Sequence, residues 1–99
     1  MHAFLTVRKL KPGTFSDWRR AWEPDEWPDG ARRAYILRNV DDPDEVIAFG
    51  FFDTPLETLQ SDPTLREQQN ARLERMAPHV ASTGVDGIYE VVEEVTPTR

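Results

Sequence analysis

Three tryptophans are the residues of this chain whose type and spacing best suit a binding site for a flat ring. Trp18 and Trp22 lie four positions apart, so a helix would present both on one face, and Trp27 follows in a proline-flanked segment. Indole rings form the walls of pockets in which stacking holds an aromatic ligand. Alternatively, the tryptophans fill the core above two small strand residues, Ala48 and Gly50. The candidate ligand-binding residues are Trp18, Trp22, Trp27 and Gly50.

The candidate catalytic residues are His79, Tyr35 and Tyr89. His79 is the only histidine away from the N-terminus, and an imidazole can act as a general base near neutral pH. We expect both tyrosines beneath the helices, where a phenol can hydrogen-bond a hydroxyl or carbonyl of a substrate. The structural alternatives are a solvated or helix-capping histidine and two tyrosines buried for packing alone.

Composition excludes several classes of function. The formal net charge of −6 argues against nucleic acid or an anionic membrane surface as a partner. The chain contains no cysteine, which excludes thiolate catalysis and disulfides. Its two distant histidines, without a carboxylate at ligand spacing, predict no metal site, and no nucleotide-binding or nucleophile motif is present. With neither a signal peptide nor a membrane-length apolar run, the expected location is the cytoplasm.

The order of the predicted elements is β-α-β-β-α-β. Thr54-Pro55-Leu56-Glu57 predicts a helix start in which the Thr54 side chain accepts a hydrogen bond from the backbone N–H of Glu57. This order predicts one ferredoxin-like α+β domain over residues 1–99, with both helices on one face of an antiparallel sheet. The predicted segments are strands 3–7, 33–39, 45–52 and 87–95, a helix after Thr14, a helical region after Thr54 that breaks near residue 61, and a loose tail at 96–99.

The two faces of this sheet differ in what must cover them. We assign to the face beneath the helices the residues Ala3, Leu5, Val7, Tyr35, Leu37, Ala48, Gly50, Phe52, Tyr89 and Val91. The other face carries large apolar side chains that would form an unusually large exposed patch in a monomer. We therefore predict a homodimer formed by these faces, in which Arg38 and Glu90 pair across the interface. The predicted interface residues are Phe4, Ile36, Arg38, Ile47, Phe49, Phe51, Glu90 and Val92.

Two stretches carry a resemblance to a known family. In the first, Val-Ile-Ala-Phe-Gly-Phe-Phe-Asp-Thr-Pro-Leu-Glu-Thr-Leu at 46–59, an aromatic strand leads through Asp53 into a helix. The second is the closing strand, Tyr-Glu-Val-Val-Glu at 89–93. The chain resembles the dimeric α+β barrel superfamily, and within it the antibiotic-biosynthesis-monooxygenase-like (ABM-like) proteins. This resemblance implies a pocket between the helices and the sheet of each subunit.

The haem-degrading branch of that superfamily is a poorer match. It uses an Asn on the first strand, then a Trp and a His on or near the second helix. The corresponding positions here are Thr6 or Arg8, then Gln69, then His79. Two of the three residues are therefore replaced, and the resemblance does not imply haem degradation.

Three hypotheses for function remain. The first is a monooxygenase-like oxidoreductase that needs no cofactor and acts on an aromatic or hydrophobic small molecule. In it the tryptophans are pocket walls, the tyrosines hydrogen-bonding anchors and His79 the base. The second is a non-catalytic dimeric module that binds a hydrophobic metabolite, and the third an accessory protein with a filled core. A cavity beneath the helices would separate the third hypothesis from the first two.

Overall fold

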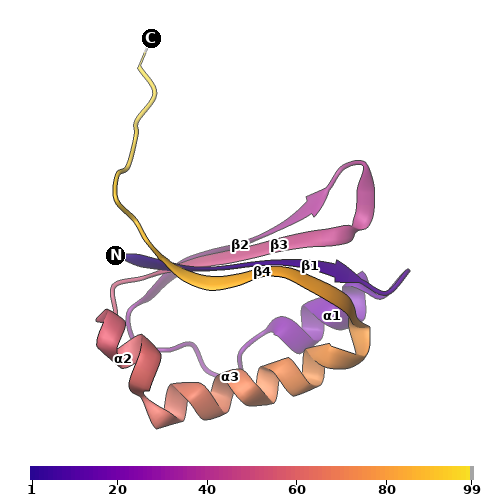
Figure 1. The fold of residues 1–99 in the computed structure, drawn as a ribbon, viewed down its shortest axis with the longest axis horizontal. Helices are drawn as coiled ribbons and strands as arrows, with labels where there is room; N and C mark the ends of the chain where they lie inside the picture. The colour runs from indigo at the N-terminus through magenta and orange to yellow at the C-terminus, as the bar shows by residue number, and fades with distance from the viewer. Residues whose placement is uncertain (99) are drawn as a thin grey trace.

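The computed structural model describes residues 1–98 and has two layers, a sheet with its helices on one side (Figure 1). The sheet is antiparallel throughout, with strand order β2-β3-β1-β4. This arrangement confirms the predicted ferredoxin-like α+β fold. The elements are β1 (His2–Leu10), α1 (Phe15–Trp22), β2 (Ala31–Asn39), β3 (Asp42–Phe52), α2 (Leu56–Ser61), α3 (Pro63–Met76), the 3-10 helix η1 (Ala77–His79) and β4 (Val80–Glu90).

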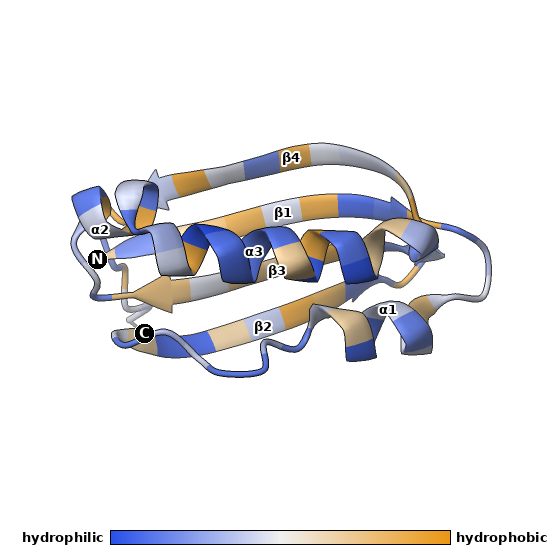
Figure 2. Cartoon of the chain, turned by 90° about the horizontal axis from the view of Figure 1, so that it is seen from below, coloured by the Kyte–Doolittle hydropathy of each residue, from blue (hydrophilic) through white to orange (hydrophobic). Residues whose placement is uncertain are grey.

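The core lies between the sheet and the two longer helices. Seen from the helix side, α3 runs lengthwise across the middle of the sheet, and α1 lies nearer β2 (Figure 2). Trp18 and Trp22 project from α1 at helical spacing and are buried, as predicted for one face of a helix. They pack with Leu10, Val46, Ala48 and Met76 into the buried cluster. Within residues 1–98, none of the helices combines the length and apolar composition needed to cross a membrane.

The prediction for Thr54 is wrong. Its hydroxyl donates to the backbone carbonyl of Asp29 at 2.7 Å, and α2 has no side-chain cap. The break predicted near residue 61 is present, and the cap belongs to the helix that follows it. The Asp62 carboxylate accepts from the backbone N–H groups of Thr64 (2.8 Å) and Leu65 (3.3 Å), with Pro63 in the first turn.

The last strand also differs from its predicted range of 87–95. It begins at Val80 and ends at Glu90, and its first half is too polar to carry a strand pattern. The strand ends there because β1, its neighbour in the sheet, ends too. The last backbone hydrogen bond runs from the Val91 N–H to the carbonyl of Met1, at 3.0 Å. The chain then leaves the sheet on the side away from the helices (Figure 1). Of the predicted loose tail, Arg99 lies outside the described residues.

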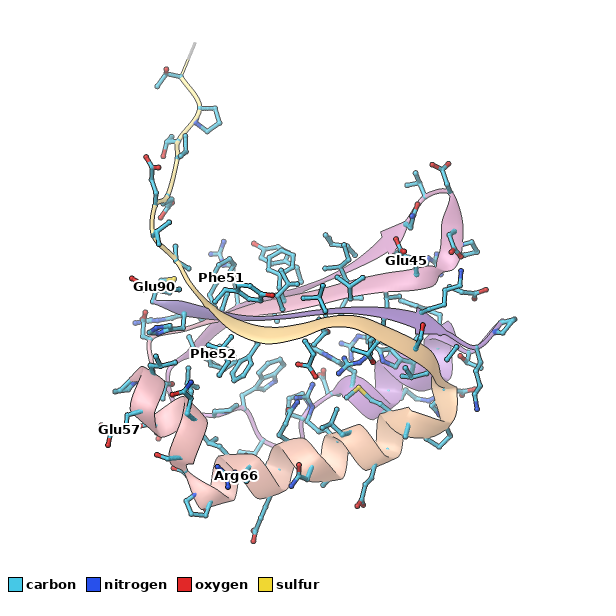
Figure 3. The ribbon with its side chains drawn as sticks, in the orientation of Figure 1. Glu45, Phe51, Phe52, Glu57, Arg66 and Glu90 are labelled. Carbon is cyan, nitrogen blue, oxygen red and sulfur yellow. The ribbon has the colours of Figure 1, made fainter. Side chains whose placement is uncertain are left out.

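The register shows which side chains share a face, because directly paired residues of antiparallel strands point the same way. On β3 the predicted alternation is correct: Ala48, Gly50 and Phe52 face the helices, and Phe51 points away from them (Figure 3). On the other three strands it is inverted. Phe4 pairs with Gly50, whereas Tyr35 pairs with Phe49, which belongs to the opposite face.

Ring contacts agree with this register. The rings of Phe4 and Phe52 meet edge-on, with their centres 5.1 Å apart. The Arg38 guanidinium lies 4.7 Å from the centre of the Phe15 ring on α1. The physical reason for the inversion is that a shift of one residue turns every side chain of a strand to the other face. The predicted interface residues Phe4, Ile36 and Arg38 therefore lie on the helix side. Glu90 shares its row with Phe52, so the predicted Arg38–Glu90 pair is not positioned to cross an interface.

Asp62→Ala tests the cap of α3. We expect it to lower the free energy of unfolding by about 1 kcal/mol, because two backbone N–H groups lose their acceptor. Asp62→Asn keeps an acceptor oxygen and should retain most of that stability. Glu67→Ala, at an exposed position of the same helix, is the matched control. Urea unfolding curves measure all three, and an Asp62→Ala curve that overlays the wild type would contradict the assignment.

Candidate functional site

A pocket of about 250 Å³ lies between the helices and the sheet. Its floor is the helix side of β1 and β3, and its roof is α3 with the segment that follows α1. Small residues at the floor, Ala48 and Gly50, leave the space open beneath larger side chains above. The principal lining residues are Phe4, Thr6, Arg8, Ala48, Gly50 and Phe52 from the sheet, Trp22, Trp27 and Leu65 above it, Gln69, Arg72 and Met76 from α3, and Asp86 from β4.

Aromatic rings form the apolar walls. The Phe4 and Phe52 rings meet edge-on across β1 and β3, and the Trp22 and Trp27 rings meet edge-on with their centres 5.9 Å apart. Edge-on pairs place the positive edge of one ring on the negative face of the next. Such walls offer ring faces to a flat ligand.

The loop that carries Trp27 is held at its base by the start of the α2 segment. Gly30 has a φ of +87°, and a side chain there would also crowd Thr54. The N–H of Asp53 donates to the Gly30 carbonyl at 2.9 Å, and Asp53 forms an ion pair with Arg32. Together with the hydrogen bond from Thr54 to Asp29, these contacts hold both ends of the Asp53-Thr54 pair against the loop. The pair thus positions a pocket wall and does not cap a helix.

Arg8 brings a positive charge to the pocket from β1. Its exposed fraction is 4%, and its Nη1 donates to the Thr6 hydroxyl at 3.1 Å. Burial lowers the pKa of Arg8 below its usual value, and the charge of Asp86 partly offsets that effect. Asp86 is an exposed residue on the pocket wall.

Arg72 brings a second positive charge from α3. Its Nε donates to the Trp22 carbonyl and its Nη1 to Gln69 Oε1, each at 2.8 Å, and its guanidinium lies 5.3 Å from the centre of the Trp22 ring. Burial in the first place, and then the charges of Arg8 and Arg75, lower the pKa of Arg72 to about 10 against an opposing effect of Glu23. Arg72 is still protonated at neutral pH. Among residues 1–98, neither Arg8 nor Arg72 forms a salt bridge.

The structure separates the predicted ligand-binding residues into two groups. Trp22, Trp27 and Gly50 line the pocket. Trp18 lies in the core with no exposed surface and does not line the pocket, so the structural alternative fits it better. Its buried indole N–H has no hydrogen-bond acceptor in the described part of the chain, an unfavourable feature of this core.

None of the three predicted catalytic residues lines this pocket. Tyr35 stacks on Phe49 with ring centres 5.2 Å apart, on the helix-free face. Tyr89 lies on the same face, over the bare backbone of Gly87. His79 ends η1, where its backbone carbonyl accepts from the N–H of Lys11 at 2.8 Å. The expected placement of the tyrosines beneath the helices is therefore wrong, because the register turns them outward.

The two arginines and Asp86 are charged site residues that sequence reasoning missed. Arg8 follows Phe4 and Thr6 at strand spacing, so a correct face for β1 would have found it. Thr6, Arg8 and Gln69, which stand at positions of the haem-branch residues, all line the pocket. Arg72 gave no signal, since α3 is largely polar and its weak amphipathic pattern does not single out an inward arginine.

Solved structures similar to this chain come from several bacteria. One is a candidate antibiotic biosynthesis monooxygenase from Bordetella bronchiseptica, with a TM-score of 0.71 and 11% identity over 93% of this chain and 97% of that one. A second, from Chloroflexus aurantiacus, has a TM-score of 0.69 and 14% identity over 96% of each chain. SnoaB, a cofactor-independent oxygenase from Streptomyces nogalater, has a TM-score of 0.60 and 10% identity over 97% of each chain.

These similarities confirm the predicted resemblance at the level of the fold. No protein-family model matches the chain, and no curated protein is significantly similar to it in sequence. The chain thus has the α+β fold of the antibiotic biosynthesis monooxygenase proteins, with sequence identities of 10–14% to the three structures described.

Arg8→Met tests whether the buried charge lowers stability. Without a ligand, we expect this change to raise the free energy of unfolding by about 1 kcal/mol, because a buried cation with no salt-bridge partner is replaced by an apolar chain of similar length. Arg8→Lys keeps the charge and should give no such gain. Thermal and urea unfolding measure both. A loss of more than about 2 kcal/mol in Arg8→Met would show instead that the guanidinium is well compensated.

Proposed function

We propose that this protein is a monooxygenase-like enzyme that needs no cofactor and oxidises a flat aromatic molecule held in the pocket. The single observation that supports it most is an aromatic-walled pocket of about 250 Å³ between helices and sheet. The fold is shared with SnoaB, a cofactor-independent oxygenase, which makes this chemistry the first to test. The pocket argues against the third hypothesis, a core with no cavity.

In the proposed reaction the substrate supplies its own electrons. A ring methylene conjugated with a carbonyl loses a proton, and the resulting anion reduces O₂. One oxygen atom becomes a new ring carbonyl, and the other leaves as water with the two methylene hydrogens, so that R₂CH₂ + O₂ gives R₂CO + H₂O. The protein's part is to orient the ring between aromatic walls and to keep bulk water away from the reactive intermediate. Asp86 is positioned on the pocket wall to accept the first proton.

The second candidate function is binding without turnover. It is favoured by the placement of His79, Tyr35 and Tyr89, none of which lines the pocket as an acid or base would. A protein of this kind would sequester an aromatic metabolite in the same space. The two candidates share a ligand class and differ only in whether the ligand is oxidised.

Oxygen uptake with anthrone separates these candidates. We expect the protein to convert anthrone to anthraquinone faster than buffer does, consuming one O₂ for each product formed. Trp22→Ala should lower kcat/KM at least about tenfold, since it removes a pocket wall. His79→Gln should match the wild type in rate and pH profile. Binding of anthrone without oxidation would favour the second candidate, and no binding would count against both.

We further propose that the working form is a homodimer in which the helix-free sheet faces meet. Paired rows across the four strands place apolar side chains together on this face, and Phe49 contacts both Tyr35 and Phe51 through its ring. Tyr35, Leu37 and Tyr89 are 41%, 46% and 50% exposed, so a continuous apolar patch faces water in the single chain. A second copy presents the same patch and can cover it around a two-fold axis.

The residues of this interface differ from those predicted. Ile47, Phe49 and Phe51 keep their predicted place, and Leu5, Val7, Tyr35 and Leu37 join them from strands whose faces were inverted. Val92 lies in the segment beyond β4 and is 86% exposed, so it remains a proposed contact. This segment runs out on the same side of the sheet as the patch (Figure 1).

Light scattering tests the dimer. The wild type should have twice the single-chain mass of 11.4 kDa at low micromolar concentration. Phe49→Asp with Phe51→Asp should give single chains, because charges would be buried at the interface without partners. Leu56→Asp, at an exposed residue of α2, is the matched control and should stay dimeric. A wild-type mass of 11.4 kDa would contradict the dimer.

A further inference from the structure

We propose that the pocket binds an aromatic oxyanion, whose charged oxygen lies between the guanidinium groups of Arg8 and Arg72. The inference rests on the proposed function for the place of the ligand and goes further in naming its charge. The two arginines reach the same pocket from opposite layers, Arg8 from the sheet and Arg72 from α3.

The first argument is that these two charges lack counter-ions. Arg8 is 4% exposed, and its one side-chain hydrogen bond among the described residues goes to a neutral hydroxyl. Arg72 is half-buried, and both of its side-chain acceptors, a backbone carbonyl and an amide, are neutral as well. Buried cations are normally paired, because burial without a partner is costly. An anionic ligand would supply the missing partner for both.

The second argument is that the cationic character is local to this pocket. The chain as a whole has a net charge of −6, yet two arginines occupy the pocket interior and repel each other. The carboxylates on the pocket wall, Glu26 and Asp86, belong to exposed residues. Asp86 acts on Arg8 through space without forming a salt bridge within residues 1–98. The interior thus favours negative charge even though the protein is acidic.

The third argument combines charge with shape. Guanidinium groups bind carboxylates and other oxyanions through directed N–H donors. The surrounding walls are the rings of Phe4, Trp22, Trp27 and Phe52. A volume of about 250 Å³ is below the range of drug-sized ligand pockets, about 300–1,000 Å³. These features together select a compact, flat ring system that carries a carboxylate or an ionised hydroxyl.

This site would also assist the proposed oxidation. Deprotonation of a methylene conjugated with a carbonyl places negative charge on the carbonyl oxygen, and fixed positive groups stabilise such charge where water is excluded. The arginines would thereby lower the pKa of the bound substrate and make a strong protein base unnecessary. That role accounts for a pocket without His79.

Isothermal titration calorimetry at neutral pH tests the charge of the ligand. We expect 2-naphthoate to bind at least tenfold more tightly than 2-naphthamide, which has a similar shape and no charge. Arg72→Gln and Arg8→Met should each reduce naphthoate affinity at least tenfold and leave naphthamide affinity unchanged. Arg20→Gln removes an exposed arginine of α1 outside the pocket and should bind as the wild type does. Should Arg8→Met fail to fold, the wild-type melting shift with each ligand and the Arg72→Gln titration decide.

A pH titration of 2-naphthol distinguishes the two kinds of oxyanion. If an ionised hydroxyl can occupy the site, the absorbance of bound naphthol should show its pKa lowered by at least one unit from the free value. A bound naphthol without that shift, together with tight naphthoate binding, assigns the site to carboxylates. Either result supports an oxyanion site.

Equal affinities for naphthoate and naphthamide would overturn the inference, as would unchanged naphthoate binding in both arginine variants. These outcomes are distinct from failure of the proposed enzyme. Naphthoate binding without anthrone oxidation would retain the anion site and remove the enzyme. Anthrone oxidation without a preference for naphthoate would do the reverse.

Discussion

The pairing of Phe4 with Gly50 across β1 and β3 decides which side chains the pocket receives. It places the even-numbered residues of β1 beneath the helices, so that Phe4 becomes a wall and Thr6 and Arg8 become polar lining. The same register turns Leu5 and Val7 toward the other face, where they meet Phe49 and Ile47. Because the side-chain period of a strand is two residues, one choice of register fixes both surfaces of the sheet.

Features that form the pocket lower the stability of the domain. A chain of 99 residues has little surplus stability, and yet within residues 1–98 it buries Arg8 without a salt bridge and the Trp18 N–H without an acceptor. Small residues at Ala48 and Gly50 leave space that larger side chains would fill. A buried charge beside unfilled space is the pattern expected of a binding site, where a ligand compensates what the protein alone does not.

Two segments far apart in sequence cooperate to shape that cavity. The Asp53-Thr54 pair, which joins β3 to α2, fixes the loop before β2 through Asp29 and Gly30. This contact holds Trp27 against Trp22 at the open side of the pocket. On the opposite surface of the sheet, the exposed rings of Tyr35 and Tyr89 give the molecule an apolar face with a different role. One sheet thus separates a proposed ligand site from a proposed association surface.

The sequence by itself determined the order of the elements, the aromatic β3, the helix break before Asp62 and the inward face of α1, because each depends on local pattern or local capping. Those features sufficed for the fold and for Trp22, Trp27 and Gly50 as pocket residues. Only the tertiary structure decided the faces of β1, β2 and β4, since short strands with apolar residues on both sides fit either register. It also decided the hydrogen bond of Thr54, whose hydroxyl donates to the backbone carbonyl of Asp29 in a distant loop and caps no helix. The arginine pair of the pocket, finally, required two layers to come together: Arg8 and Arg72 are 64 positions apart, and only packing α3 on the sheet makes them neighbours.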